Sequence, residues 1–515
     1  MLLAALVLTA AAWMRGAEYD EQYTLFLTAG VPRPDWPRTV FPAGMVATVQ
    51  AGHATLTGIA RDLRATDVHP PLYFWGAALW RPVFGPGLFA ARMLSVLCGV
   101  VSIWLVGTIA SRCAVRPALA MLFTLGSYGF VYTSVIARGF ALAEMLILAG
   151  VALLLGRQRL LAGVFFGAAC CCNYLAVFVA AAVVVASGGW LAVVSAAPFL
   201  AVDAWFFAAQ HAARAGQFPP FEIWPSVVRL VGYQTAAVFG GLPLYVDGIA
   251  RLVLGVGVGL CAVWLLIGIG RSRPLCGDRA VWVLLGAAVA TPVGLLLLGA
   301  AFDNTPIELR YLSFGLPFVG ILGAGGLFPS CRVASQRRGP RSGYGLAGLI
   351  FHNPSSPLVQ PAESGRIPGS RPGMTGSERR STLAIVLVLT IQLASIAGLL
   401  LSPRTMQPAR AAATDAARLA GDGVVLLPRG NDGVGIAGAF GIEAPPSLSL
   451  LLVGPNDAIM SGIGGHRRVV LVLLAQDRDS TAAVAMMRAA FAHPNWRRVA
   501  IGSNVEIYER TEKQE

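Results

Sequence analysis

Apolar runs close to 20 residues long recur along most of the chain, and they limit its possible folds more than any other feature. A helix needs about 20 apolar residues to cross the hydrocarbon core of a bilayer. Hydrophobic residues make up 56% of the 515 positions and charged residues 13%, about half the usual charged share. A soluble protein could not bury that much apolar surface. About eleven membrane-spanning helices are expected, at 1–15, 88–110, 117–135, 139–156, 160–172, 175–186, 190–208, 249–270, 279–300, 311–328 and 382–401.

The placement of arginine gives the orientation of these helices. The formal net charge is +13, from 39 basic and 26 acidic residues, and basic residues concentrate in cytoplasmic turns of membrane proteins. Short Arg-rich turns end alternate segments, as at Arg112, Arg157 and Arg271. We therefore expect a multi-pass membrane protein with a cytoplasmic N-terminus. The charge then reflects membrane topology and not a nucleic-acid partner.

The runs divide the chain into regions. Residues 1–330 are predicted to form a transmembrane domain with a large first outer loop at 16–87. Residues 331–380 hold eight arginines and two glutamates in a Pro/Gly/Ser-rich stretch, which predicts a disordered basic cytoplasmic loop. Residues 381–401 form the last transmembrane helix. A second outer loop, rich in Pro, Trp and Phe, is expected at 209–248.

The C-terminal region, 402–515, is predicted to be a small extramembrane α/β domain. GVVLLP at 423–428 and RVVLVLL at 468–474 favour buried strands, and residues 480–492 favour an amphipathic helix. A final strand is expected at 499–508.

Three glycines in the same region, Gly433, Gly435 and Gly438, have GxGxxG spacing. That motif can mark a dinucleotide site. No acidic residue follows at the required distance with a strand, so we do not expect such a site here.

Three acidic residues, Glu18, Asp20 and Glu21, follow the first apolar run directly. Asp20 and Glu21 lie where a charged side chain must reach the outer interface, because a carboxylate in the hydrocarbon costs about 2.5–3.5 kcal/mol. A carboxylate there can accept a proton from a hydroxyl nucleophile. A solvated helix end is the alternative.

Cationic candidates lie at other outer boundaries. His69 opens the segment HPPLYFW, whose aromatic content suits an interfacial helix. Arg92, Arg138 and Arg310 stand at predicted helix boundaries, where a guanidinium can bind phosphate through two parallel hydrogen bonds. Snorkelling of each arginine to the interface is the alternative.

In their order, these motifs resemble the GT-C glycosyltransferases, especially bacterial relatives of the dolichyl-phosphate-mannose protein mannosyltransferases and the lipid A aminoarabinose transferase. Asp20-Glu21 resembles the family's acidic pair, and His69 to Tyr73 resembles its HPPLYY motif. The stretches Phe84–Ser95, Arg138–Leu142 and Arg310–Pro317 are similar to its FG…RLPS, RxYAL and RYL…P motifs. Together the motifs cover about residues 20–320.

The chain departs from the family at several places, and Phe74 replaces the last tyrosine of the HPPLYY motif. Ile136 stands where relatives often have glutamate, and Phe140 replaces a tyrosine. His69 stands where aminoarabinose transferases have lysine, and the one lysine here is Lys513.

The resemblance implies an inverting transfer of a hexosyl or pentosyl group from a polyprenyl-phosphate donor to a hydroxyl acceptor at the outer leaflet. The acceptor could be a protein, lipid A or a glycan. No cofactor or metal is required, although a divalent metal is not excluded. A transporter or flippase of lipid-linked sugars, or a non-catalytic lipid-binding relative, remains the alternative. The implied roles are Asp20 and Glu21 as catalytic residues, His69, Arg138 and Arg310 as donor phosphate ligands, and Tyr73, Arg92 and Tyr311 as support.

Overall fold

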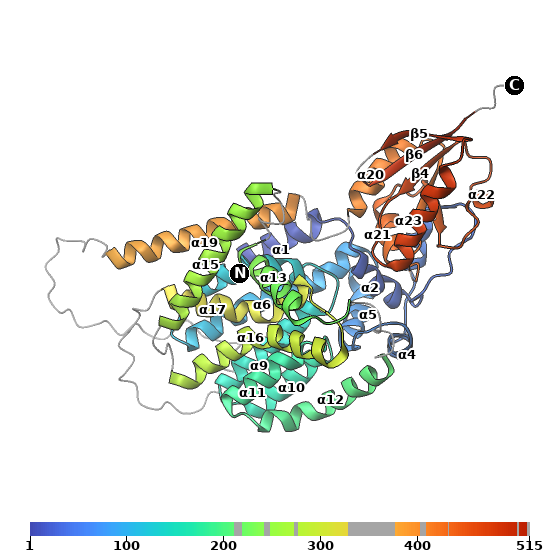
Figure 1. The fold of residues 1–515 in the computed structure, drawn as a ribbon. Coiled ribbons are helices and arrows are strands. Elements are labelled where there is room, and N and C mark those ends of the chain that lie inside the picture. Colours follow the sequence, from blue (N-terminus) through green and yellow to red (C-terminus); the bar gives the residue numbers. More distant parts are fainter. Residues whose placement is uncertain are drawn as a thin grey trace, which may run out of the picture.

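The computed structural model describes residues 1–210, 219–240, 248–271, 277–327, 376–401, 408–430, 432–501 and 504–511. A large helical body carries a smaller α/β unit at one end (Figure 1). The elements of the body are α1 (Leu2–Met14), α6 (Leu88–Arg112), α7 (Pro117–Leu125), α8 (Tyr128–Ser134), α9 (Phe140–Leu155), α10 (Arg159–Cys170), α11 (Ala176–Ser187), α12 (Leu191–Gln210), α13 (Ile223–Phe239), α15 (Gly248–Arg271), α16 (Gly277–Phe302), the 3-10 helix η2 (Leu309–Gly315), α17 (Leu316–Leu327) and α19 (Gly376–Leu401).

The predicted apolar runs all contain helix, with differences in their boundaries. The run 117–135 breaks at Gly126 into α7 and α8, and the run 311–328 begins as η2. Helix α19 begins at Gly376, so the last residues of the predicted disordered loop are helical. The remainder of that loop, 331–375, lies outside the described residues.

The second predicted outer loop, 209–248, is corrected by the structure because α13 occupies its middle. Leu230 and Ala237 of α13 are buried. The helix ends inside the body, where Gln392 Nε2 donates to the Val238 carbonyl and Ser395 Oγ donates to the Phe239 carbonyl. The prolines and aromatics that suggested a loop are concentrated before this helix and at its first turn.

Several helices have the length and polarity of membrane spans. Among the described residues, four helices, at 88–112, 191–210, 279–302 and 382–401, are long and apolar enough to cross a bilayer. Five shorter apolar helices accompany them. The chain is therefore a multi-pass membrane protein, and the number of crossings stays a prediction.

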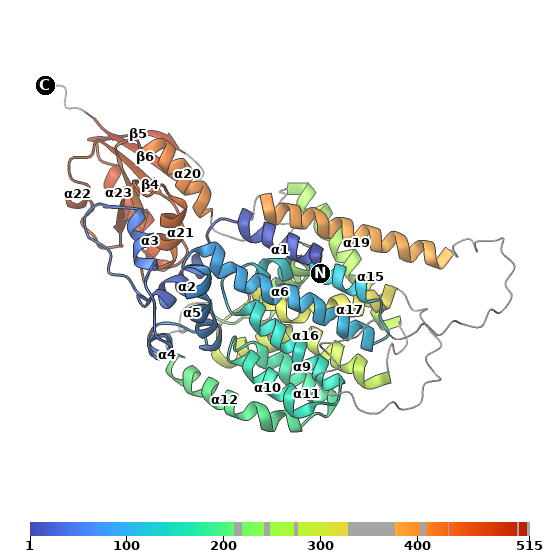
Figure 2. The same ribbon diagram turned by 180° about the vertical axis from the view of Figure 1, so that it is seen from behind.

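The first outer segment is folded and joins the two parts of the molecule. It forms α2 (Tyr19–Ala29), β1 (Phe41–Pro42), α3 (Gly44–Gln50), α4 (Leu56–Thr66) and α5 (Leu72–Phe84). Figures 1 and 2 show α2 and α3 beside the C-terminal unit and α5 beside the body.

The C-terminal unit is a mixed sheet in the order β1-β3-β2-β4-β6-β5. The chain 499–508 forms parts of two antiparallel strands and not the single strand expected. The edge strand β1 comes from the first outer segment and pairs with β3, with Phe41 opposite Leu450. The elements are α20 (Ala409–Ala420), β2 (Val424–Pro428), α21 (Gly435–Glu443), β3 (Ser449–Val453), α22 (Ile459–Gly462), β4 (Arg468–Val472), α23 (Arg478–Phe491), β5 (Trp496–Ile501) and β6 (Val505–Arg510).

Helices cover both faces of this sheet. Side chains alternate along a strand, so Val425 and Leu427 of β2 pack with α20 and α21 while Val424 and Leu426 pack with α23. The apolar core under α21 also includes Phe26 of α2. The helix that carries Asp20 therefore shares a core with the C-terminal unit.

Candidate functional site

Helix α2 carries the predicted acidic pair in its first turn. Glu18 is the N-cap and forms a capping box with Glu21, and Gly30 ends the helix with a φ of 85°. Thr24 Oγ1 donates to the Ala137 carbonyl at 2.7 Å, which fixes α2 against the segment before Arg138. Both ends of α2 and one face are thereby fixed in place.

The two acidic residues have different surroundings. The Asp20 side chain is 19% exposed and forms an ion pair with Nη1 of Arg310. Glu21 is fully buried. Its carboxylate accepts from Arg92 Nε at 2.7 Å and from the Ala137 backbone N–H at 2.9 Å. Asp20 can therefore reach a substrate, whereas Glu21 is shielded by protein.

Arg92 is a structural cation in this arrangement. Besides Glu21, its guanidinium donates to the carbonyls of Ala12, Arg15 and Gly16. These contacts join α6 to the end of α1 and to the link before α2. Arg92 is therefore engaged with protein groups, and its predicted support of the site is mechanical.

Arg310 approaches Asp20 from η2. Nη2 lies 2.5 Å from Glu308 Oε2. Nε is buried, and among the described residues no acceptor lies within hydrogen-bond reach of it. The guanidinium carbon lies 5.5 Å from the Tyr311 ring centre, and that ring stacks on Phe140 with centroids 6.2 Å apart. Phe140 thus lies against the residue next to Arg310.

Arg138 lies beside Tyr23, which is one helical turn after Asp20 on α2. The side chain is buried, and its guanidinium carbon lies 5.8 Å from the Tyr23 ring and 5.6 Å from the Phe74 ring. Nη1 lies 3.9 Å from Asp67 Oδ2, too far for a hydrogen bond, and finds no acceptor among the described residues. An unused N–H on a buried guanidinium is a donor available to an anion.

His69 lies between Asp67 and Arg138. Its Nδ1 lies 2.8 Å from Asp67 Oδ1, and its Nε2 lies 3.3 Å from Arg138 Nη2. Arg138 Nη2 lies closer to His69 Nδ1, at 3.1 Å, so the imidazole ring packs between the Asp67 carboxylate and the Arg138 guanidinium. Burial by itself would raise the pKa of Asp67, but the His69 charge and hydrogen bond, with Arg138, hold that pKa below its usual range.

A pH dependence of stability follows from Asp67. A carboxyl whose pKa is lowered by folding stabilises the fold above its unfolded pKa of about 4 and loses that contribution as pH falls. We expect Asp67→Asn to cost about 2 kcal/mol at pH 7. The difference in the free energy of unfolding between this variant and the wild type should become smaller below about pH 4. Thermal unfolding of both proteins from pH 7 to pH 3.5 measures this, with Asp62→Asn on α4 as the control. A gap that stays constant would contradict it.

The structure brings some predicted residues together and separates others. Asp20, Arg310 and Tyr311 form one group. His69 and Arg138 form a second group, which lies beside Tyr23 at the next turn of α2. Tyr73 is fully buried, with its ring edge-on to Phe74. Glu21 and Arg92 form the pair behind Asp20.

Two carboxylates of the site, Asp67 and Glu308, were not among the residues predicted from the sequence. Each stands two residues before a predicted cation, in DVHPP and IELR. That spacing could have identified them, since a buried cation requires a nearby carboxylate. Burial raises the pKa of Glu308 to about 7, with a smaller contribution from Glu18.

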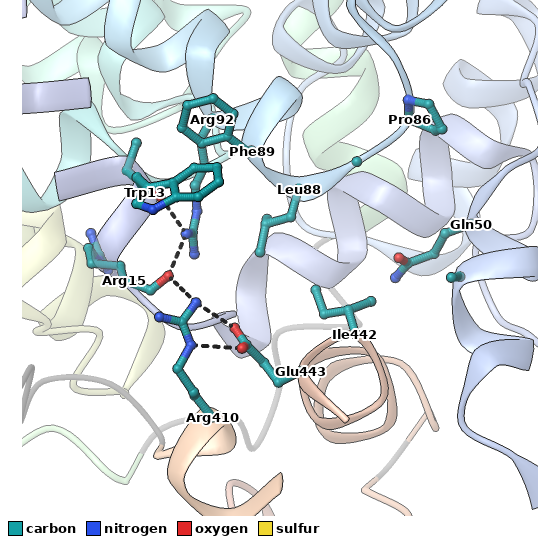
Figure 3. Close-up of a pocket in the computed structure, with 13 residues that line it drawn as sticks. Trp13, Arg15, Gln50, Pro86, Leu88, Phe89, Arg92, Arg410, Ile442 and Glu443 are labelled. Carbon is teal, nitrogen blue, oxygen red and sulfur yellow. Dashed lines mark hydrogen bonds and ion pairs between the residues drawn. The ribbon is translucent and has the colours of Figure 1, made fainter. Parts of the chain in front are cut away.

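A cavity of about 600 Å³ lies between the end of α1, the start of α6, α3 and the helices α20 and α21 of the C-terminal unit (Figure 3). Trp13, Leu88 and Phe89 line it together with the ion pair of Arg410 and Glu443. Of the predicted site residues, Arg92 belongs to its described lining. The cavity is thus separate from the group around Asp20.

Comparisons with known proteins give structural matches alone. No family model and no curated protein matches the chain. The crystal structure of ArnT from Cupriavidus metallidurans bound to undecaprenyl phosphate is similar over 99% of this chain and 97% of its own, with 13% identity and a TM-score of 0.47. The crystal structure of the same protein in its apo state is similar over 98% of this chain and 96% of its own, with 13% identity and a TM-score of 0.49.

The arabinosyltransferase EmbB from Mycobacterium smegmatis is also similar. It matches 79% of this chain and 39% of its own, with 13% identity and a TM-score of 0.35. At such identities and scores, the assignment of a function has to come from the residues of the site.

Proposed function

We propose that the protein is a membrane glycosyltransferase of the GT-C type. It moves a sugar from a polyprenyl-phosphate donor to a hydroxyl acceptor at the outer face of a bacterial inner membrane. One observation supports this assignment. The half-buried Asp20 carboxylate contacts the Arg310 guanidinium, and Arg138 lies beside Tyr23, one turn after Asp20 on α2. The site therefore pairs a proton acceptor with cations for a leaving phosphate.

Arg138 and Arg310 are suited to the leaving group. Each has a buried N–H that finds no acceptor among the described residues. Phosphate oxygens accept such hydrogen bonds, and a fixed positive charge stabilises an anion that develops in the transition state. His69 acts through Arg138, which it orients together with Asp67. The two guanidinium groups supply positive charge for the leaving phosphate.

Asp20 serves as the general base. The acceptor hydroxyl gives its proton to the Asp20 carboxylate while its oxygen bonds to the anomeric carbon. The bond from that carbon to the phosphate oxygen breaks, and polyprenyl phosphate leaves with the electron pair. One direct displacement of this kind inverts the anomeric centre. Glu21 is a positioning residue here, because its carboxylate is fully buried against Arg92.

Transfer itself is the test. The purified protein in sealed proteoliposomes is given radiolabelled undecaprenyl-phosphate sugars, hexoses and pentoses in turn, with bacterial envelope extract as the acceptor. Movement of label from the lipid into a new product supports the assignment. Label that crosses the bilayer on an unchanged lipid would instead show a flippase, and label that stays bound and unchanged would show a lipid-binding protein.

Arg310→Gln tests the phosphate role separately. We expect the transfer rate to fall by about 10²–10³, the usual cost of one donor to a developing oxyanion. Weaker binding of undecaprenyl phosphate, measured with the same variant, should accompany this fall. Arg61→Gln is the matched control, because the Arg61 side chain is 80% exposed on α4. An equal loss in both variants would contradict the role given to Arg310.

A further inference from the structure

The C-terminal unit touches α2 directly through the glycines of its GxGxxG motif. A Cβ atom on Gly435 would lie 2.2 Å from Cε2 of Tyr19, and one on Gly438 would lie 2.7 Å from Oε1 of Gln22. Both distances are far below van der Waals contact. The two glycines therefore let α21 approach α2, on the residues that flank Asp20 and Glu21.

Hydroxyl and carboxylate groups continue this contact. The Tyr23 hydroxyl donates to the Tyr19 hydroxyl at 2.9 Å, and the Tyr19 hydroxyl donates to Asp477 Oδ2 at 3.5 Å. Burial, with the charge of Asp432, raises the pKa of both tyrosines, so both hydroxyls remain donors. The ring of Tyr23 is also the one beside Arg138. Polar contacts thus run from the C-terminal unit to the part of α2 that lies beside Arg138.

A second attachment holds the link between α1 and α2 (Figure 3). Arg410 donates to the carbonyls of Met14 and Arg15 and pairs with Glu443 at 2.7 Å. Glu443 also accepts the backbone N–H of Ala17 at 2.6 Å. The residues just before α2 are therefore bonded to the last residue of α21 and to α20.

From these contacts we propose that the C-terminal unit is part of the catalytic site, with Gly435 and Gly438 as positioning residues that place Asp20. The inference rests on the proposed function. It also gives the GxGxxG spacing a role different from nucleotide binding, because side chains of α2 occupy the space beside two of its three glycines. The unit supplies the contact that keeps α2 at a fixed distance from Arg310.

The sharpest test uses the pair Gly435 and Tyr19. A methyl group on Gly435 collides with ring atoms of Tyr19, and Tyr19→Ala removes them. We expect Gly435→Ala to lower kcat at least about tenfold, as misplacement of a catalytic group does. Binding of undecaprenyl phosphate should change less than about twofold, since Arg138 and Arg310 belong to the body. In a Tyr19→Ala background, the same glycine substitution should cost little, which makes the two effects non-additive.

Gly465→Ala is the matched control, because a Cβ there meets nothing within 4 Å. Amide hydrogen exchange gives a readout independent of activity. In Gly435→Ala, exchange should rise in α2 while α23 keeps wild-type protection. Additive effects in the cycle, or unchanged exchange in α2, would overturn the positioning role. Absence of sugar transfer by the wild type would overturn the proposed function alone, because the exchange measurement still reports on α2.

Discussion

Replacing Asp20 by asparagine is expected to lower sugar transfer by about 10²–10⁴, the usual contribution of a general base. Asparagine keeps the size of the side chain but cannot take a proton from an acceptor hydroxyl. Its amide oxygen can still accept from Arg310, so the protein should remain folded and bind undecaprenyl phosphate. Rate and binding are measured on the same detergent-purified sample.

Asp415→Asn provides the control for this prediction. Asp415 lies on α20, paired with the exposed Arg418, and its replacement should leave transfer within about twofold because surface pairs contribute little. Full transfer by the Asp20 variant would mean that another group is the base. In that case, Glu308, which contacts the same Arg310, becomes the next residue to replace.

The second large effect is structural. Arg92→Met leaves the Glu21 carboxylate buried without its cation and removes the donor to the carbonyls of Ala12, Arg15 and Gly16. Breaking a buried ion pair in this way costs about 3–5 kcal/mol. We expect a much lower unfolding midpoint in detergent and poor recovery of folded protein.

Arg418→Met, which breaks an exposed pair, should cost less than about 1 kcal/mol. A stable Arg92 variant that loses undecaprenyl phosphate binding would contradict the mechanical role and return Arg92 to the phosphate site. The contrast with Asp20→Asn is therefore informative, because one variant is inactive but folded and the other is unstable.

Much of the helical body could be anticipated from hydrophobicity alone, since each apolar run has to be buried or face lipid. Helix α13 was missed because aromatic residues such as Trp224 and nearby prolines also suit an interfacial loop. Its packing on Gln392 and Ser395 depends on residues more than 150 positions away. No local pattern carries that information.

The site shows the same limit. The motifs identified Asp20 and Arg310 as candidate site residues, but the contact between them joins distant parts of the chain. Glu21 and Arg92 were candidates because charge at an interface suggests function, and the fold pairs them with each other, which no local pattern indicated. The glycines of the C-terminal unit matched a nucleotide motif by spacing, and the residues that pack against Gly435 and Gly438, Tyr19 and Gln22, lie more than 400 residues earlier.

The short strand β1 has a consequence for how the protein is made. Phe41 pairs with Leu450, so one edge of the C-terminal sheet is synthesised at the start of translation and its partner near the end. At about 5–20 residues per second, the ribosome takes roughly 20–80 s to bring the two together. During that interval the helices of the body are synthesised, and α2 lacks its partner in the C-terminal unit. The contact between α2 and the C-terminal unit is therefore completed as one of the last steps of assembly.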